Sequence, residues 1–134
     1  MDLEKLADYH LWANDRAREI IRGLSEEEFT RDVVPPLGSV KRLCIHMVMA
    51  IEYNLLSRVH GEEVDPYEMD DELDAMPVDE LMDRWREADL RLRRTVRRPP
   101  NNNHLLYHPT NRWKIEVKIR RLHRLHKKKN AYSK

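Results

Sequence analysis

The chain has 134 residues, of which 37% are charged and 40% hydrophobic, a size that fits one domain with a core needing no disulfide or structural metal. The single cysteine, Cys44, excludes an intramolecular disulfide and favours a reducing compartment. No apolar run approaches a membrane span and the first residues lack the pattern of a signal peptide, so the sequence predicts a cytoplasmic protein with no membrane partner.

The first predicted helix covers about residues 3–24. Its expected buried face recurs at helical spacing and comprises Leu3, Leu6, His10, Ala13, Ala17, Ile20 and Leu24. His10 is expected to hydrogen-bond in this seam, with a role as a metal ligand as the lesser alternative. A capping box from Ser25 to Glu28 then begins a short turn that ends before Pro35.

The second predicted helix runs from Gly38 to His60, with Ser39 as its N-cap and Gly61 just beyond it. Its apolar stripe comprises Leu43, Met47, Ala50, Ile51 and Leu55, and His46 is expected to project into the same seam. A buried imidazole needs a partner, which is either a core carbonyl or carboxylate, or a metal ion. Cys44 is expected to be a small buried residue.

An acidic loop is predicted over residues 62–79, with solvated carboxylates at Asp70, Asp71, Glu72 and Asp74. A calcium site there is disfavoured because the regular ligand spacing and central glycine are missing. The third helix is predicted to begin at Pro77 or Val78 and to stop before Pro99. Its packing seam comprises Val78, Leu81, Trp85, Ala88 and Leu92.

The fourth segment is read as a short extended stretch around residues 112–117 that runs into a helix. His123 and His126 are three residues apart and would share one face of that helix. Together with His46 they would supply three nitrogen ligands and leave one open position, which is the pattern of catalytic zinc. The alternative is a solvated basic face. His104 and His108 are expected to lie exposed in the preceding polar loop.

Landmarks along the first 95 residues resemble the DinB/YfiT-like family. They are the run Tyr9-His10-Leu11-Trp12-Ala13-Asn14, the turn at residues 24–28, Gly38-Ser39-Val40 leading into the helix with His46, Glu52, Leu56, His60-Gly61, and the helix at 78–92. The resemblance implies an all-α, up-and-down four-helix bundle, often dimeric, that holds a divalent metal with three histidines.

The resemblance also implies a function, namely that of a metal-dependent hydrolase or a transferase acting on low-molecular-weight thiols. The first family ligand falls on His46, and the family's other two ligands lie four apart in the fourth helix, followed by Arg-Gly-Gln. This chain has no such signature, so His123 and His126 stand in for those ligands, and residues 97–134 of the single domain 1–134 are atypical. Zinc or nickel is the expected metal because imidazole suits both and no thiolate pair is present.

Charge divides the chain sharply. Residues 1–90 hold 10 Lys/Arg and 23 Asp/Glu, a net charge of −13, whereas residues 91–134 hold 15 Lys/Arg and one acid, a net charge of +14. Three explanations stay open: the basic segment binds a partner, it folds back on the acidic body or on that of a dimer mate, or the reading frame or the C-terminus has changed.

The complementary charges and the seam of the third helix predict a homodimer. The rival function is a non-enzymatic dimeric bundle whose basic C-terminal surface binds a partner such as nucleic acid. Nucleic acid is the minority interpretation, because aromatic residues that would stack on bases are few and no recognised binding module is present.

Overall fold

The computed structural model describes residues 2–33, 35–36 and 38–100, and every regular element within them is helical. The elements are α1 (Leu3–Arg22), α2 (Glu26–Thr30), α3 (Val40–Met49), the π-helix η1 (Ala50–Leu56), α4 (Ser57–His60), α5 (Pro66–Asp74) and α6 (Val78–Arg97). The predicted all-α class is therefore confirmed for this part of the chain. The fourth helix of the predicted bundle falls in residues 101–134, which lie outside the described residues.

The helix ends follow local capping chemistry. The carboxylate of Asp2 accepts hydrogen bonds from the backbone of α1's first turn. The capping box forms as predicted, because the Ser25 backbone N–H donates to Glu28 Oε1 at 3.0 Å and the Glu28 N–H donates to Ser25 Oγ at 3.2 Å. The hydrogen bond from Ser25 lowers the pKa of Glu28.

The predicted second helix is one continuous rod made of α3, η1 and α4. Ser39 caps its start by accepting from the Arg42 backbone N–H at 3.1 Å. Gly61 ends it in the left-handed conformation, with φ of 68°. Both ends agree with the prediction, whereas the π-helical segment was not predicted. A π-helix has more residues per turn than an α-helix, so it changes which side chains of the rod face the core.

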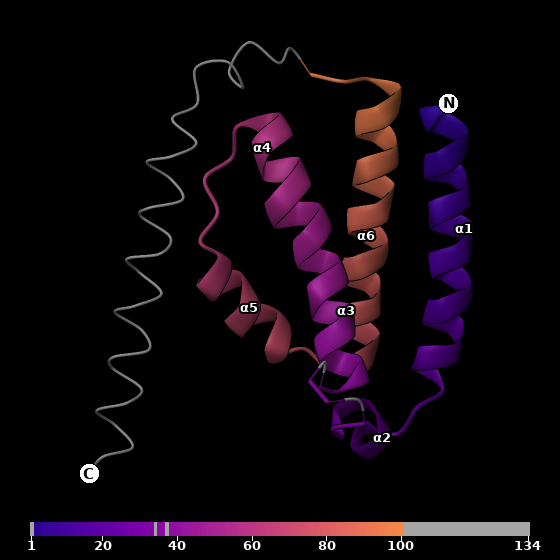
Figure 1. Cartoon of the computed structure of the whole chain (residues 1–134), viewed down its shortest axis with the longest axis vertical. Helices are drawn as coiled ribbons and strands as arrows, with labels where there is room; N and C mark the ends of the chain where they lie inside the picture. Colours follow the sequence, from indigo (N-terminus) through magenta and orange to yellow (C-terminus); the bar gives the residue numbers. More distant parts are fainter. Residues whose placement is uncertain (1, 34, 37, 101–134) are drawn as a thin grey trace.

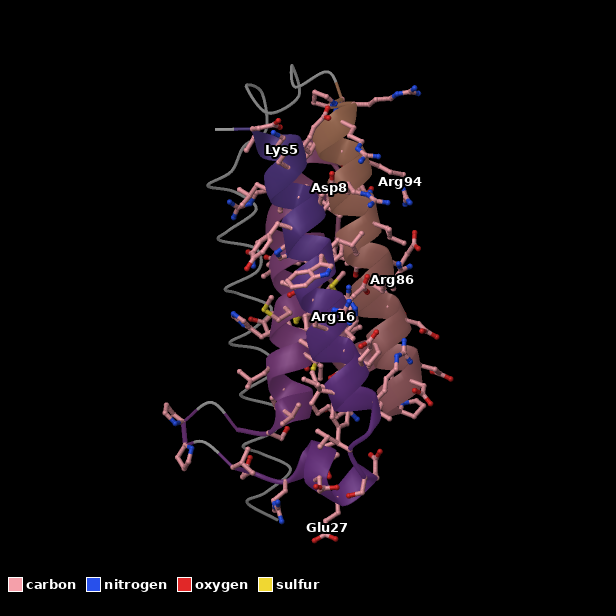
Figure 2. The ribbon with its side chains drawn as sticks, turned by 90° about the vertical axis from the view of Figure 1, so that its right-hand side faces the viewer. Lys5, Asp8, Arg16, Glu27, Arg86 and Arg94 are labelled. Carbon is pink, nitrogen blue, oxygen red and sulfur yellow. The ribbon has the colours of Figure 1, made fainter. Side chains whose placement is uncertain are left out.

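Helix α6 is the centre of the arrangement. Its main packing partners are α1 on one side and the α3–η1 rod on the other (Figure 1). Figure 2 shows the same layout from the side of α1, with α6 beside it. The C-terminal end of α6 lies at the same end of the bundle as the N-terminus of α1 (Figure 1).

The core lies where α3, η1 and α6 meet, with contributions from α2 and α5. Its most buried side chains include Phe29, Ile45, Leu56, Leu81 and Met82. The predicted seam of the third helix is confirmed at its centre, because Leu81, Trp85 and Ala88 are buried. Burying each large side chain contributes roughly 1.5–3 kcal/mol, so this cluster is the main source of stability.

The predicted buried face of α1 is confirmed in part, since Ala17 and Leu24 are half-buried and pack against the core. It is wrong for Leu3, Leu6 and Ile20, which are 61%, 49% and 73% exposed, while the buried apolar positions of α1 are Ala7 and Leu11. The reason is that α6 packs mainly against the neighbouring face of α1. A row of uncovered apolar side chains therefore runs along α1.

The predicted acidic loop is also corrected, since part of it forms α5. Asp65 caps this helix, and Pro66 stands at its first turn, where a missing N–H costs nothing. The carboxylates expected to be solvated include three in ion pairs. Asp70 and Asp74 lie 2.9 Å and 3.6 Å from Arg42, and Glu72 lies 2.9 Å from Arg84. These pairs attach α5 to α3 and α6. Over residues 2–100, apart from 34 and 37, no helix is both long and apolar enough to cross a membrane.

Candidate functional site

A shallow apolar cavity of about 520 Å³ lies between α1 and η1 and has α6 as its floor. Its wall includes Leu6, Tyr9 and His10 from α1, Leu55 from η1, and Leu92 and Val96 from α6. Leu6, Tyr9 and Leu55 are each more than two-fifths exposed. Such an uncovered apolar surface is typical of a site that another helix or a ligand fills.

His46 does not project into the core. The buried residues of α3 are Cys44, Ile45 and Val48, whereas His46 is exposed and Leu43, one turn earlier, is 38% exposed. The predicted stripe is buried at Ile51 and half-buried at Met47, but its start at Leu43 and His46 lies on a face of α3 that the described helices leave open. The interpretation of His46 as a satisfied core histidine is therefore wrong. Within the described residues its imidazole makes no hydrogen bond or ion pair, which leaves it available to an external partner.

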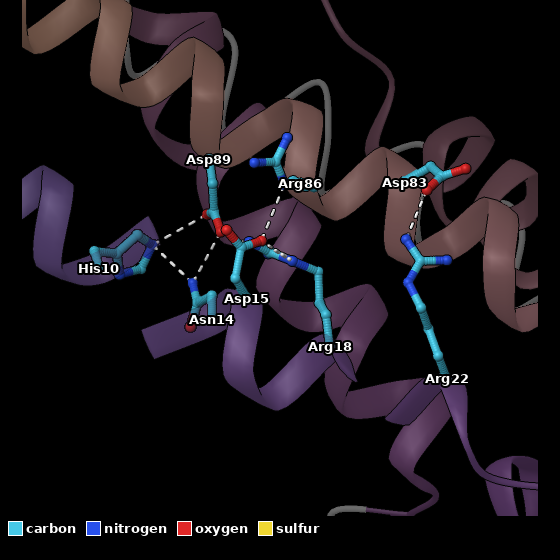
Figure 3. A network of polar contacts seen from close by, with 8 residues as sticks. All are labelled: His10, Asn14, Asp15, Arg18, Arg22, Asp83, Arg86 and Asp89. Carbon is cyan, nitrogen blue, oxygen red and sulfur yellow. Dashed lines mark hydrogen bonds and ion pairs between the residues drawn. The ribbon is translucent and has the colours of Figure 1, made fainter. Parts of the chain in front are cut away.

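His10 belongs to a polar network that joins α1 to α6 (Figure 3). Its Nε2 lies 3.1 Å from Asp89 Oδ1 and 3.1 Å from Asn14 Nδ2, and Asn14 also donates to Asp89 Oδ2 at 3.1 Å. With Asn14 donating to the carboxylate, the arrangement fits an Nε2–H that donates to Asp89. The predicted hydrogen bond of His10 in the helix seam is therefore confirmed, and its Nε2 is not free to bind a metal.

The charges of this network are balanced. Asp89 and Arg18 are each 2% exposed, and Arg18 donates to Asp89 Oδ2 at 2.6 Å. Arg18 also donates to Asp15 at 2.8 Å, and Arg86 donates to Asp15 at 3.0 Å. Burial acts to raise the pKa of Asp15, but the hydrogen bonds from the two arginines outweigh it and lower the pKa. The network is a buried ion pair with satisfied partners that fixes how α1 packs on α6.

Cys44 is confirmed as a small core residue. It is 2% exposed, and burial raises the pKa of its thiol to about 11. The nucleophile and the metal ligand in cysteine chemistry is the thiolate. A neutral, enclosed thiol therefore contributes packing and no chemistry.

Of the three histidines in the metal site predicted from the sequence, the described residues include His46. His123 and His126 lie outside the described residues, as do His104 and His108. Between residues 2 and 100, no group of three or more His, Cys, Asp or Glu side chains is placed to hold a metal ion. Of the three predicted ligands, His46 is therefore the one that the described residues include.

A second cavity, of about 580 Å³, was not singled out from the sequence. It lies at the end of α6 and is lined by His60, Arg91, Arg94, Thr95, Arg97 and Arg98. His60 Nε2 lies 3.0 Å from the Thr95 hydroxyl, which connects the end of α4 to α6. The signal in the sequence is the run of arginines from 91 to 98, whose helical spacing places several of them together.

These features define a helical protein with an open apolar cavity and an exposed histidine on α3. A model of the DinB family matches residues 1–122, and the chain belongs to the DinB family. The matched segment includes His46 and ends one residue before His123. No curated protein and no solved structure shows significant similarity to the chain.

Proposed function

We propose that the protein is a metal-dependent hydrolase or thiol S-transferase of the DinB family, and that His46 is one of three histidine ligands. The observation that carries the proposal is the position of His46. In a chain of this family, an imidazole without a described partner stands on an uncovered face of α3. The imidazole of histidine is the commonest metal ligand in proteins.

The proposal requires a fourth helix from residues 101–134. The uncovered apolar side chains Leu3, Leu6, Leu43 and Leu55 lie on α1 and on the α3–η1 rod, which is the surface that a fourth helix would bury. Helix α6 ends at Arg97, at the end of the bundle where α1 begins (Figure 1). A helix that returned from there along the open face would complete an up-and-down four-helix bundle.

A helix that follows the extended stretch predicted at residues 112–117 would carry the two late histidines along this open face toward His46. His123 and His126 share one face of such a helix and would supply the remaining two donors.

A zinc or nickel ion held by these imidazoles would supply Lewis acidity that lowers the pKa of a bound thiol or water. The chain's own contribution would be to fix the donors on rigid helices and to enclose the site against the apolar side chains of α1 and η1. A low-molecular-weight thiol is the proposed substrate of the transferase form. The proposed assembly is a homodimer in the cytoplasm.

The direct test compares zinc and nickel binding by the purified full chain and by two variants. His46→Ala is expected to lose stoichiometric binding while its circular dichroism stays unchanged. His60→Ala is the matched control, because it removes an exposed histidine near the other end of the same rod. Stoichiometric binding retained by His46→Ala, or lost equally in both variants, would refute His46 as a ligand and favour the non-enzymatic alternative.

A further inference from the structure

A cationic pocket lies at the end of α6, well separated along the rod from His46. Its lining combines four guanidinium groups, from Arg91, Arg94, Arg97 and Arg98, with the imidazole of His60 and the hydroxyl of Thr95. None of the lining residues that the structure describes is acidic. Figure 2 shows Arg94 at this end of the bundle, level with Asp8 of α1.

The arginines in this region exceed the carboxylates that pair with them. Arg91 bonds Glu62, Arg94 bonds Glu87 at 3.0 Å, and Arg97 bonds Asp8 at 3.3 Å, while Arg93 lies 3.7 Å from the same Asp8. Arg98 forms no ion pair with any described residue. Five arginines therefore face three carboxylates, which leaves an excess of two positive charges before any protonation of His60.

The existing pairs also leave most donors unused. Each of the pairs to Glu62, Glu87 and Asp8 uses a single terminal nitrogen of its arginine. A guanidinium carries five N–H donors in a planar fork, which matches the oxygens of a phosphate. The arginines that line the pocket therefore keep several N–H groups that these pairs do not use.

Helix capping does not account for these arginines. Basic residues often bond the last carbonyls of a helix, and both α4 and α6 end here. In the described structure, however, carbonyls at these helix ends accept hydrogen bonds from backbone N–H groups. The Gly61 N–H donates to the carbonyls of Ser57 and Arg58, and the Arg98 N–H donates to the carbonyl of Arg94. The hydrogen bonds of the Arg91, Arg94 and Arg97 side chains all go to carboxylates.

We infer that this pocket binds a phosphate group, held by Arg94 and Arg98 with Thr95 as a further donor. Its volume, about 580 Å³, is within the usual range of small-molecule sites and leaves room for a molecule larger than one phosphate. The phosphate comes from a small phosphorylated compound or from a nucleic-acid backbone. This site is independent of the proposed metal centre.

The test is isothermal titration of the full chain with pyrophosphate at low ionic strength. The double variant Arg94→Gln/Arg98→Gln is expected to bind at least about tenfold more weakly, since charge-assisted hydrogen bonds are lost. Both side chains are exposed, so the fold should be kept. Arg31→Gln/Arg16→Gln removes the same charge from exposed positions away from the pocket and should change affinity by less than twofold.

Two further arms make the test decisive. Lys127→Gln/Lys128→Gln removes the same charge from the basic C-terminal segment. The inference would be overturned if this variant lost as much pyrophosphate affinity as Arg94→Gln/Arg98→Gln, or more. It would also be overturned if the pocket variant and the Arg31→Gln/Arg16→Gln control lost affinity equally, or if the unaltered chain did not bind pyrophosphate. Competition by a short single-stranded DNA assigns the phosphate to a nucleic-acid backbone, whereas pyrophosphate binding without such competition assigns it to a small phosphorylated compound. Metal binding is expected to be unchanged in the Arg94→Gln/Arg98→Gln variant.

Discussion

Asp89→Ala should be among the most destabilising single substitutions in α6. The Asp89 side chain is fully buried. Its carboxylate accepts hydrogen bonds from Arg18 at 2.6 Å, from Asn14 at 3.1 Å and from His10 at 3.1 Å. Its removal would leave the guanidinium of Arg18, whose side chain is 3% exposed, without its closest counter-charge. Breaking a buried pair in this way costs about 3–5 kcal/mol, a large part of the roughly 5–15 kcal/mol that stabilises a typical domain.

The assay is urea unfolding of the full chain followed by circular dichroism. Asp83→Ala is the matched control, because Asp83 lies on the same helix and pairs with Arg22, but its side chain is 74% exposed. The control should lose at most about 1 kcal/mol. The double variant Arg18→Met/Asp89→Leu should recover most of the loss, because it removes both charges together. If Asp89→Ala unfolds at the same urea concentration as Asp83→Ala, the account of the network is refuted.

Three further predictions concern the thiol, a helix end and the response to acid. Cys44, enclosed and with a pKa of about 11, should react with a thiol-specific reagent at neutral pH only after unfolding, and rapid labelling of the native chain would contradict its buried position. Gly61→Ala should cost about 1 kcal/mol in unfolding experiments because φ is 68°, whereas Gly23→Ala, at φ of −80°, should be nearly neutral; equal effects would contradict the proposed helix end. Because the pKa of Asp15 is lowered from 3.8 in the folded state, the stability advantage of the unaltered chain over Asp15→Asn should be constant above about pH 5 and shrink as the pH falls below about 4. An advantage independent of pH would show that the Asp15 carboxylate is not stabilised by Arg18 and Arg86.

The helix ends could be predicted from the sequence because capping is local. Ser25, Ser39 and Gly61 act through backbone groups within a few residues, and each takes its predicted role. Helix α5 was not predicted because the acidic composition of residues 62–79 is typical of a solvated loop. The local signals for a helix there are the N-cap Asp65 and the proline that follows it.

Burial was harder to predict because it depends on which helices meet. The stripes containing Leu3 on α1 and Leu43 on α3 have the spacing of core faces, and each is buried in part, yet Leu3 and Leu43 themselves are exposed because the described helices pack mainly against neighbouring positions. The same limit applies to His10. Its place in the seam could be predicted, whereas its partner Asp89 lies 79 residues away in the sequence.

The charge division of the sequence takes a more specific form in the structure. The basic segment begins within α6, where Arg93 and Arg97 pair with Asp8 of α1 and Arg91 pairs with Glu62. Part of the positive charge is therefore balanced inside the described bundle, as expected if basic residues fold back on the acidic body. The remaining excess is concentrated at the cationic pocket.

X-ray absorption of the full chain loaded with one equivalent of zinc or nickel tests the proposed three-histidine centre most directly. The account predicts that the spectrum of the unaltered chain is fitted by three imidazole nitrogens, for zinc at about 2.0–2.1 Å, and that the His46→Ala variant, which no longer holds the metal stoichiometrically, gives no such spectrum. A spectrum of the unaltered chain with oxygen ligands alone, or one that is the same in the unaltered chain and in His46→Ala, would contradict it.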